Sequence, residues 1–277
     1  MGWLEALVLG IVQGLTEFLP ISSSAHQSIV GQFFGGQDVG AAFTAVTQLG
    51  TEAAVILYFR HDIWRILRSW FGSLAGRVPR NDPDARMGWL VILGSIPIVL
   101  LGLLFQNAID SALRNLWITA AMLAGFGVVI GVADRLARNV RPLESLTWGH
   151  GVVFGLAQSL ALVPGVSRSG ATISAGLALG YTREAAAKYS FLLAIPAVVG
   201  SGLFKLADIS GDPVRPAWGP ILLATVVSFV IGYVVIAWLL RYISTHDFLP
   251  FVVYRIALAV VVAVLLLTGV LVPLPQG

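Results

Sequence analysis

Long apolar stretches separated by short polar segments dominate the pattern of this chain. Most of these stretches carry no charged residue, and one is interrupted only by Glu52. A helix needs about 20 mostly apolar residues to cross the hydrocarbon core of a membrane. We therefore predict six full transmembrane helices. They cover residues 39–59, 88–105, 116–133, 189–204, 217–240 and 250–272.

Two further apolar stretches, residues 4–35 and 148–180, are interrupted in the middle. Pro20 and a run of serines break the first, and Pro164 with a second Ser-rich run breaks the other. Each piece is too short to cross a membrane alone. Proline ends a helix, and the freed backbone groups need partners inside the protein or in water. We expect both stretches to form re-entrant helix–loop–helix hairpins.

The two broken stretches are also copies of one another. A shift of 145 residues aligns them with 9 identities in the 33 ungapped positions from 3 to 35, among them Gln13 with Gln158 and Ser22 with Ser167. Three predicted spans follow each copy, and three is odd, so the second copy is inverted in the membrane. An inverted repeat of broken helices brings a shared site near the middle of the membrane.

These patterns predict an all-α polytopic membrane protein with an inverted-topology repeat. The whole chain, 1–277, forms a single membrane domain, with repeat 1 at about 1–140 and repeat 2 at about 147–277. The segment 60–86 contains six Arg and 135–141 contains three, which places both in the cytoplasm by the positive-inside rule. Both termini then lie outside. The first hairpin enters the membrane from outside and the second from the cytoplasm.

Composition supports the membrane interpretation. Hydrophobic residues make up 57% of the chain and charged residues only 11%, where soluble domains have about 25%. This excludes a disordered chain and disfavours an ordinary soluble enzyme. Cysteine is absent, which excludes disulfides and thiolate chemistry. The net charge of +3 is small, and no nucleic-acid partner is expected.

Few ionisable residues fall at membrane depth, where such groups are costly and function is the default hypothesis. Glu17, His26 and Arg168 belong to the two hairpins. Glu52 and Arg255 lie in predicted spans. Glu52 is either a partner that supports the site residues or a hydrogen bonder between helices, and we favour the second. For Arg255 we expect a structural ion pair.

The first hairpin contains the sequence QGLTEFLPISSSAH, residues 13–26. Gln13 and Glu17 are four residues apart and share one helix face. The serines 22–24 begin the next half-helix, whose free N–H groups and positive dipole end suit a phosphate. His26 follows within one turn of Ser23 and titrates near neutral pH, so it is a candidate proton carrier.

The second hairpin contains PGVSRSGAT, residues 164–172. Arg168 offers a permanently charged fork that matches phosphate oxygens. Gly165 and Gly170 let the backbone approach a ligand closely. In the repeat alignment Arg168 replaces Ser23, so one copy holds acid–base groups and the other a cation. This asymmetry favours chemistry over a symmetric pore.

Together the two motifs resemble those of the undecaprenyl-pyrophosphate phosphatases, the bacitracin-resistance phosphatases of bacterial cell membranes. The similarity extends to TQLGT at 47–51, SFLLAIP at 190–196 and FVVYR at 251–255. It implies hydrolysis of undecaprenyl pyrophosphate to undecaprenyl phosphate, which recycles the lipid carrier for peptidoglycan synthesis. It also implies a divalent cation, Mg²⁺ or Ca²⁺. The first motif of the family begins with Glu or Gln, and this chain has the uncharged option, Gln13.

The resemblance and the residue chemistry assign roles as follows. Ser23 attacks the terminal phosphate to give a phosphoserine, and His26 takes the proton. Glu17 orients His26 or holds the cation, and Arg168 binds the phosphate with the half-helix N–H groups. Direct attack by water, with Ser23 as a hydrogen-bond donor, stays open. The expected substrate-binding residues are Gln13, Ser22, Ser24, Ser167, Ser169, Gly170 and Thr172.

A flippase for undecaprenyl phosphate is the rival function, because inverted repeats of broken helices are common in transporters. We expect the protein in the bacterial cytoplasmic membrane, with the site opening to the outer face and the lipid tail in the bilayer. Whether the chain forms a homodimer is open.

Overall fold

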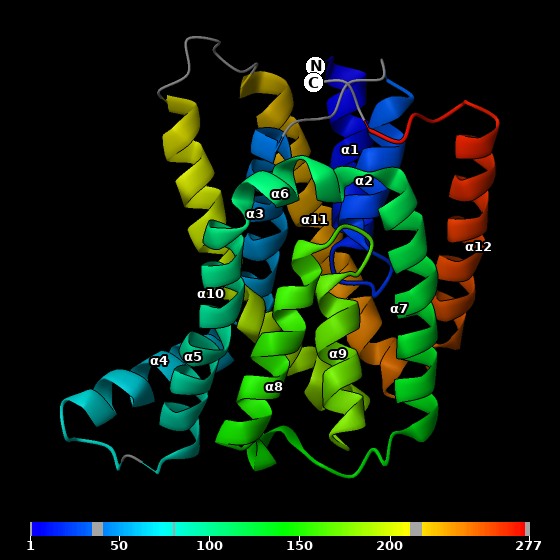
Figure 1. Cartoon of the computed structure of the whole chain (residues 1–277). Helices are drawn as coiled ribbons and strands as arrows, with labels where there is room; N and C mark the ends of the chain where they lie inside the picture. The colour runs from blue at the N-terminus through cyan, green and yellow to red at the C-terminus, as the bar shows by residue number, and fades with distance from the viewer. Residues whose placement is uncertain (1, 35–40, 80, 211–217, 275–277) are drawn as a thin grey trace.

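A computed structural model describes residues 2–34, 41–79, 81–210 and 218–274. Within these ranges the chain is helical and contains no β-strand. The α-helices are α1 (Trp3–Thr16), α2 (Ser23–Gln32), α3 (Ala41–Tyr58), α4 (Arg60–Leu74), α5 (Pro83–Leu104), α6 (Gln106–Asp110), α7 (Leu116–Leu136), α8 (Trp148–Ser159), α9 (Arg168–Ala178), α10 (Arg183–Ser210), α11 (Trp218–Ile243) and α12 (Leu249–Leu267), as Figure 1 shows. Single 3-10 turns lie at η1 (Ala112–Arg114), η2 (Leu143–Ser145) and η3 (Leu160–Leu162).

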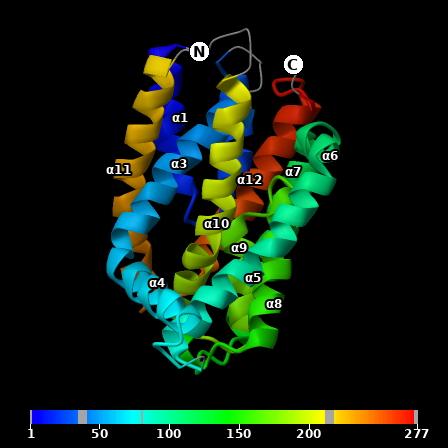
Figure 2. The ribbon, with the colours of Figure 1, turned by 90° about the vertical axis from the view of Figure 1, so that its left-hand side faces the viewer.

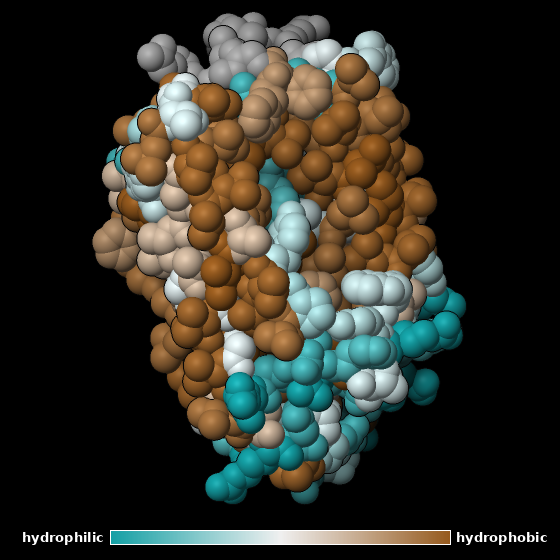
Figure 3. All heavy atoms as spheres, turned by 90° about the vertical axis from the view of Figure 1, so that its right-hand side faces the viewer, coloured by the Kyte–Doolittle hydropathy of each residue, from teal (hydrophilic) through white to brown (hydrophobic). Residues whose placement is uncertain are grey.

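Five helices of the described chain, α5, α7, α10, α11 and α12, are long and apolar enough to cross a membrane. Their apolar side chains face outward: Val226, Val230 and Val234 form an exposed row on α11. Soluble proteins rarely expose apolar surface on this scale. Figure 3 shows the resulting hydrophobic surface, interrupted by a strip of polar residues. The chain is therefore a multi-pass membrane protein.

The remaining predicted span, 39–59, forms α3, a helix of 18 residues. The two interrupted stretches form pairs of short helices, α1 with α2 and α8 with α9. In Figures 1 and 2, α1 and α2 lie toward the end that holds the chain termini, whereas α8 and α9 lie toward the opposite end. The starts of the predicted stretches 39–59 and 217–240, and Gly35 of the first hairpin, fall outside the described residues.

Each hairpin packs against a helix from the other half of the chain. Helix α1 lies along α11, and α8 lies along α5. Gly10 and Gly155, which are equivalent in the repeat, stand at these contacts. A Cβ on Gly10 would lie 2.7 Å from the Ala224 carbonyl oxygen, and one on Gly155 would lie 2.6 Å from the Gly94 carbonyl oxygen. Only glycine permits backbones to approach this closely.

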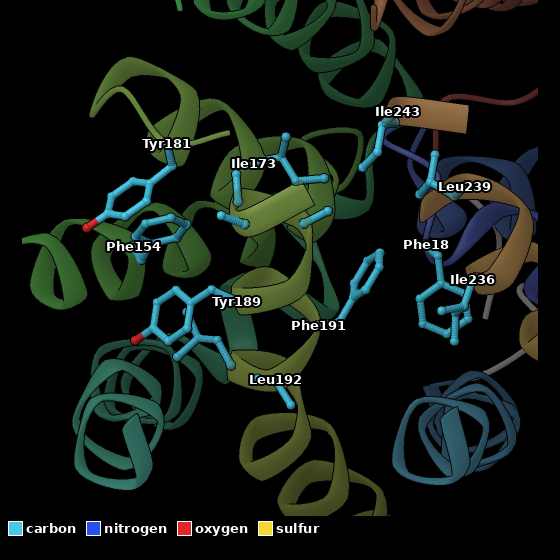
Figure 4. Packing of buried hydrophobic residues seen from close by; sticks show 14 of the residues in the cluster. Phe18, Phe154, Ile173, Tyr181, Tyr189, Phe191, Leu192, Ile236, Leu239 and Ile243 are labelled. Atoms are coloured by element: carbon cyan, nitrogen blue, oxygen red, sulfur yellow. The ribbon is translucent and has the colours of Figure 1, made fainter. Parts of the chain in front are cut away.

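Helix α10 joins the two hairpins through one aromatic cluster. Phe18, just after α1, meets the ring of Phe191 edge-on at 5.4 Å between centroids. Phe154 of α8 meets Tyr189 at 4.8 Å, also edge-on. Figure 4 shows these rings around α10. Edge-to-face pairs add about 0.5–1.5 kcal/mol to the gain from burial. The aromatic cluster therefore holds both hairpins against the same central helix.

The segment 60–86, expected to be a loop, contains the helix α4. Trp64, Phe71 and Leu74 are exposed along one side of this helix, at spacings of three and seven residues. Arg65 binds Asp62 and Asp84 beside it. Three of the six arginines in this segment, Arg60, Arg65 and Arg68, therefore lie on an amphipathic helix, the kind that rests at a membrane surface.

Arg255 ties the two hairpin turns together. Its side chain is fully buried and donates to five backbone carbonyls. These include Pro20 of the first turn at 3.0 Å and Gly165 of the second at 2.7 Å. In the described part of the chain no carboxylate pairs with Arg255, so the expected ion pair is wrong. Its charge is balanced by carbonyl dipoles instead.

We expect Arg255→Met to lower the free energy of unfolding by about 3 kcal/mol or more, because it leaves several buried carbonyls without donors. Thermal unfolding of the detergent-purified protein measures this change. Arg241→Met, at the exposed end of α11, is the matched control and should leave the melting temperature nearly unchanged. An equal effect of the two substitutions would contradict the role assigned to Arg255.

Candidate active site

The two hairpins share one unusual turn. Ser22 and Ser167, equivalent in the repeat, both have a φ of 73°, a left-handed conformation that L-residues rarely adopt. Each serine hydroxyl caps the helix that follows, accepting from the N–H of Ala25 or Gly170. Such backbone strain costs about 1–3 kcal/mol and is typical of functional sites.

The first residues of the two half-helices are Ser23 in α2 and Arg168 in α9. Helix N-termini carry free N–H groups and a partial positive charge. Both residues contact the carboxylate of Glu17, so the two half-helices start close to one point. That point is suited to an anion such as a phosphate group.

Glu17 is the centre of this cluster. Its Oε2 accepts hydrogen bonds from Ser23 Oγ at 2.7 Å and from Gln13 Nε2 at 2.8 Å. Its Oε1 accepts from Arg168 Nη2 at 2.9 Å. Only 5% of the Glu17 side chain is exposed, so these contacts are little screened by water. Three predicted catalytic residues from the two halves of the chain thus meet in a single network.

His26, the fourth predicted catalytic residue, is held elsewhere. Its Nδ1 lies 2.7 Å from the Ser22 carbonyl oxygen, and its Nε2 lies 2.7 Å from the hydroxyl of Tyr254. A carbonyl only accepts, so Nδ1 carries the proton and Tyr254 donates to Nε2. Both ring nitrogens are therefore engaged away from Ser23 and Glu17. The proton-carrier role of His26 stays a prediction, whereas the acceptor that Ser23 actually contacts is Glu17.

The other predicted binding residues divide into two sets. The hydroxyl of Ser22 lies 3.1 Å from that of Ser24, and the hydroxyl of Ser167 lies 3.1 Å from that of Ser169. Ser24 is partly exposed beside Ser23, where it can reach a ligand. By contrast, Thr172 is fully buried and contacts the Arg168 carbonyl and the Ser190 hydroxyl, so its hydroxyl anchors α9 to α10.

Three of these residues also have backbone or second contacts. Ser169 Oγ donates to the Leu19 carbonyl and joins the two hairpins, and the N–H of Gly170 is used in capping α9. Gln13 accepts from Gln27 at 3.3 Å. These contacts are made within the protein, and their role is to hold the residues around Glu17 in position.

Two carboxylates beside Arg168 are oxygen ligands of the kind that a hard divalent cation takes, and the described residues hold no group of three or more acidic, His or Cys side chains suited to a metal. Mg²⁺ and Ca²⁺ prefer carboxylate and carbonyl oxygens. Glu17 supplies one carboxylate, and a second, Glu52 of α3, lies 3.9 Å from Arg168 Nη1. Glu52 Oε1 is buried and has no hydrogen-bond partner among the described residues. Two carboxylates therefore lie on either side of Arg168, and Oε1 of Glu52 makes no hydrogen bond with the described residues.

Comparisons with known proteins find one family and several relatives that match nearly the whole chain. Residues 6–261 match the family described as Bacitracin resistance protein BacA. The chain is 63% identical over 277 residues to an undecaprenyl-diphosphatase of Kineococcus radiotolerans, covering 100% of this chain and 98% of the relative. It is 60% identical over 275 residues to that of Micrococcus luteus, covering 98% and 99%. Undecaprenyl-diphosphatase 2 of Streptomyces coelicolor is 57% identical, covering 99% and 98%.

The hydrogen bonds of His26 predict its tautomer. We expect nitrogen NMR of histidine-labelled protein to show His26 protonated at Nδ1, because the Ser22 carbonyl can only accept. Tyr254→Phe removes the donor to Nε2 and should shift the Nε2 resonance while leaving Nδ1 protonated. His26→Gln identifies the signal. Protonation of His26 at Nε2 in the unaltered protein would contradict this geometry.

Proposed function

The chain belongs to the Bacitracin resistance protein BacA family, and from this we infer that it is an undecaprenyl-diphosphatase of the bacterial membrane. It hydrolyses undecaprenyl pyrophosphate to undecaprenyl phosphate and phosphate, which regenerates the lipid carrier for peptidoglycan synthesis. The observation that carries this conclusion is the network in which Glu17 joins Ser23 to Arg168 at two helix N-termini.

We propose that the terminal phosphate binds where α2 and α9 begin. Arg168 offers a fork of donors, and its Nη1 has no hydrogen-bond partner among the described residues. The hydroxyls of Ser23 and Ser24 lie at the start of α2 on the partly exposed side. Positioning and neutralisation of charge are most of what phosphoryl transfer needs from a protein.

The chemical step follows from the shortest contact of Ser23. Its Oγ attacks the terminal phosphorus, and its proton passes to Glu17 Oε2, which already accepts that hydrogen bond at 2.7 Å. An O–P bond forms at Ser23, and the bond from phosphorus to the bridging oxygen breaks. That oxygen leaves with undecaprenyl phosphate, a good leaving group that needs no protonation.

Hydrolysis of the phosphoserine completes the cycle. A water molecule attacks the phosphorus, and the bond to Ser23 Oγ breaks. The oxygen of Ser23 regains the proton that Glu17 took, and the phosphate departs as dihydrogen phosphate with both protons of the water. Arg168 stabilises the charge on the phosphoryl oxygens in both steps. Gln13 donates to Glu17 and keeps its Oε2 turned toward Ser23.

His26 is best suited to hold the start of α2. It bonds the carbonyl of the strained Ser22 and the hydroxyl of Tyr254 on α12. Imidazole in this position fixes the direction in which Ser23 points.

A bound Mg²⁺ or Ca²⁺ would neutralise pyrophosphate charge, with Glu17 among its oxygen ligands.

For the membrane arrangement we propose six spans and two re-entrant hairpins related by an inverted repeat. The crosswise packing of α1 on α11 and α8 on α5 supports this pseudo-symmetry. The Arg-rich segments at the end opposite the termini support a cytoplasmic location for that end. The site then opens to the outer face of the cytoplasmic membrane, with the polyprenyl tail in the bilayer. A homodimer stays a prediction.

Arg168→Ala should reduce phosphate release from undecaprenyl pyrophosphate by about a thousandfold, because the main cation for the phosphoryl oxygens is lost. Released phosphate is measured with the detergent-purified protein and Mg²⁺. Arg135→Ala, exposed at the end of α7, is the matched control and should retain full activity. Lipid movement across vesicles without phosphate release, by the unaltered protein, would favour a flippase and contradict the proposed hydrolysis.

Ser23 should carry the phosphate transiently. Acid quenching of a reaction with radiolabelled terminal phosphate should trap label on the unaltered protein and none on Ser23→Ala. Ser24→Ala, one residue away, should still become labelled. If Ser23→Ala retains more than about a tenth of the activity, water attacks directly and Ser23 is only a hydrogen-bond donor.

A further inference from the structure

Glu52 is a buried acid that the reaction described above does not use. It lies in the middle of α3, and only 1% of its side chain is exposed. Its Oε1 has no hydrogen-bond partner within the described chain. A buried carboxylate oxygen without a partner is costly, and a water molecule, an ion or a ligand removes that cost.

The other oxygen of Glu52 faces the active site. Oε2 lies 3.9 Å from Arg168 Nη1, too far for a hydrogen bond. Nη1 likewise has no hydrogen-bond partner in the part of the chain that is described. The neighbouring amino group, Nη2, is firmly bonded to Glu17. The guanidinium of Arg168 therefore lies between two carboxylates, one tightly and one loosely held.

The charges of this cluster do not suit the substrate alone. Glu17 and Glu52 together outweigh Arg168 by one negative charge when both are ionised. Arg255 is fully engaged with backbone carbonyls of the turns nearby. A pyrophosphate brings further negative charge, and at low dielectric its repulsion from two carboxylates is strong. A divalent cation bound by the same two acids reverses this balance.

Glu52 also provides a second carboxylate near Arg168, which α1 does not. Glu17 directly follows α1 and contacts Arg168, whereas Gln13, one turn earlier in α1 and 2.8 Å from Glu17, is uncharged. A second carboxylate must come from another helix, and α3 provides it. The two acids approach the same guanidinium from α3 and from the turn after α1, and its Nη1 is buried without a hydrogen-bond partner among the described residues.

We propose that Glu52 is the second carboxylate ligand of the divalent cation that this enzyme uses, together with Glu17. When a phosphate takes the amino groups of Arg168, Glu17 Oε1 and both oxygens of Glu52 become available to Mg²⁺ or Ca²⁺. This inference rests on the proposed phosphatase function, since the pyrophosphate is what draws Arg168 away. If Glu52 only anchors Arg168, its removal weakens lipid binding and leaves the affinity for metal unchanged.

Binding of Mn²⁺, a probe for Mg²⁺ and Ca²⁺, tests the assignment without any turnover. The EDTA-treated, detergent-purified protein is titrated with Mn²⁺ in the presence of a methylene-bridged undecaprenyl pyrophosphate, and free Mn²⁺ is followed by electron paramagnetic resonance. We expect one site in the unaltered protein. Glu52→Gln should raise its Kd by at least about tenfold. Glu5→Gln, in the first turn of α1, is the matched control and should bind normally.

A compensating substitution separates ligation from folding. Gln13→Glu in the Glu52→Gln background restores a second carboxylate beside Glu17, and we expect it to restore Mn²⁺ binding. Melting temperatures show whether Glu52→Gln folds. Should it fail to fold, Glu52→Asp takes its place, and because its shorter side chain withdraws the ligand, it should also bind Mn²⁺ more weakly.

The outcomes distinguish the inference from the function on which it rests. Normal Mn²⁺ affinity of Glu52→Gln, or of Glu52→Asp where that variant is used, overturns the ligand assignment. So does the absence of any Mn²⁺ site in an unaltered protein that still hydrolyses undecaprenyl pyrophosphate. Conversely, Glu52-dependent Mn²⁺ binding by a protein that releases no phosphate overturns the phosphatase function and leaves the metal site standing.

Discussion

The carboxylate of Glu17 is the contact on which the site depends. It accepts from Ser23 on one oxygen and from Arg168 on the other, and these residues begin half-helices from opposite ends of the bundle. Bringing two helix N-termini together concentrates partial positive charge, and a buried anion between them offsets that charge. Glu17 serves this purpose in this structure. In the proposed reaction the pyrophosphate takes the contact with Arg168, and a divalent cation would offset the negative charge of Glu17 and Glu52.

The surrounding fold fixes this geometry from two sides. Arg255 bonds the carbonyls of both hairpin turns, so the turns cannot separate without exposing a buried charge. Glycines at equivalent places let each hairpin lie directly on a helix from the other half. Phe191 and Tyr189 of α10 each pack against a ring from one hairpin, so both hairpins are held against the same helix. A rigid frame of this kind is what positioning a phosphoryl group requires.

The sequence predicted an all-helical membrane protein and the breaks within residues 4–35 and 148–180, because runs of apolar residues and helix-breaking prolines can be recognised from the sequence alone. The arrangement of six spans and two re-entrant hairpins stays a prediction. Glu17 and Arg168 were identified from the cost of ionisable residues at membrane depth, and Ser23 from the serine run at the start of a half-helix and the family resemblance. Other features depend on tertiary packing that no local pattern reveals. Arg255 binds carbonyls instead of an acid, and His26 faces Tyr254 across the bundle. The helix α4 was missed although Trp64, Leu67, Phe71 and Leu74 recur at helical spacing, because its many arginines indicated a loop.

The proposed mechanism requires the terminal phosphate to bind where α2 and α9 begin. A crystal or cryo-EM structure of the protein with a methylene-bridged analogue of undecaprenyl pyrophosphate would locate it. We expect phosphoryl oxygens bonded to Arg168 and the terminal phosphorus in line with Ser23 Oγ. A phosphate bound elsewhere in the bundle, with Glu17 still bonded to both Ser23 and Arg168, would contradict the mechanism.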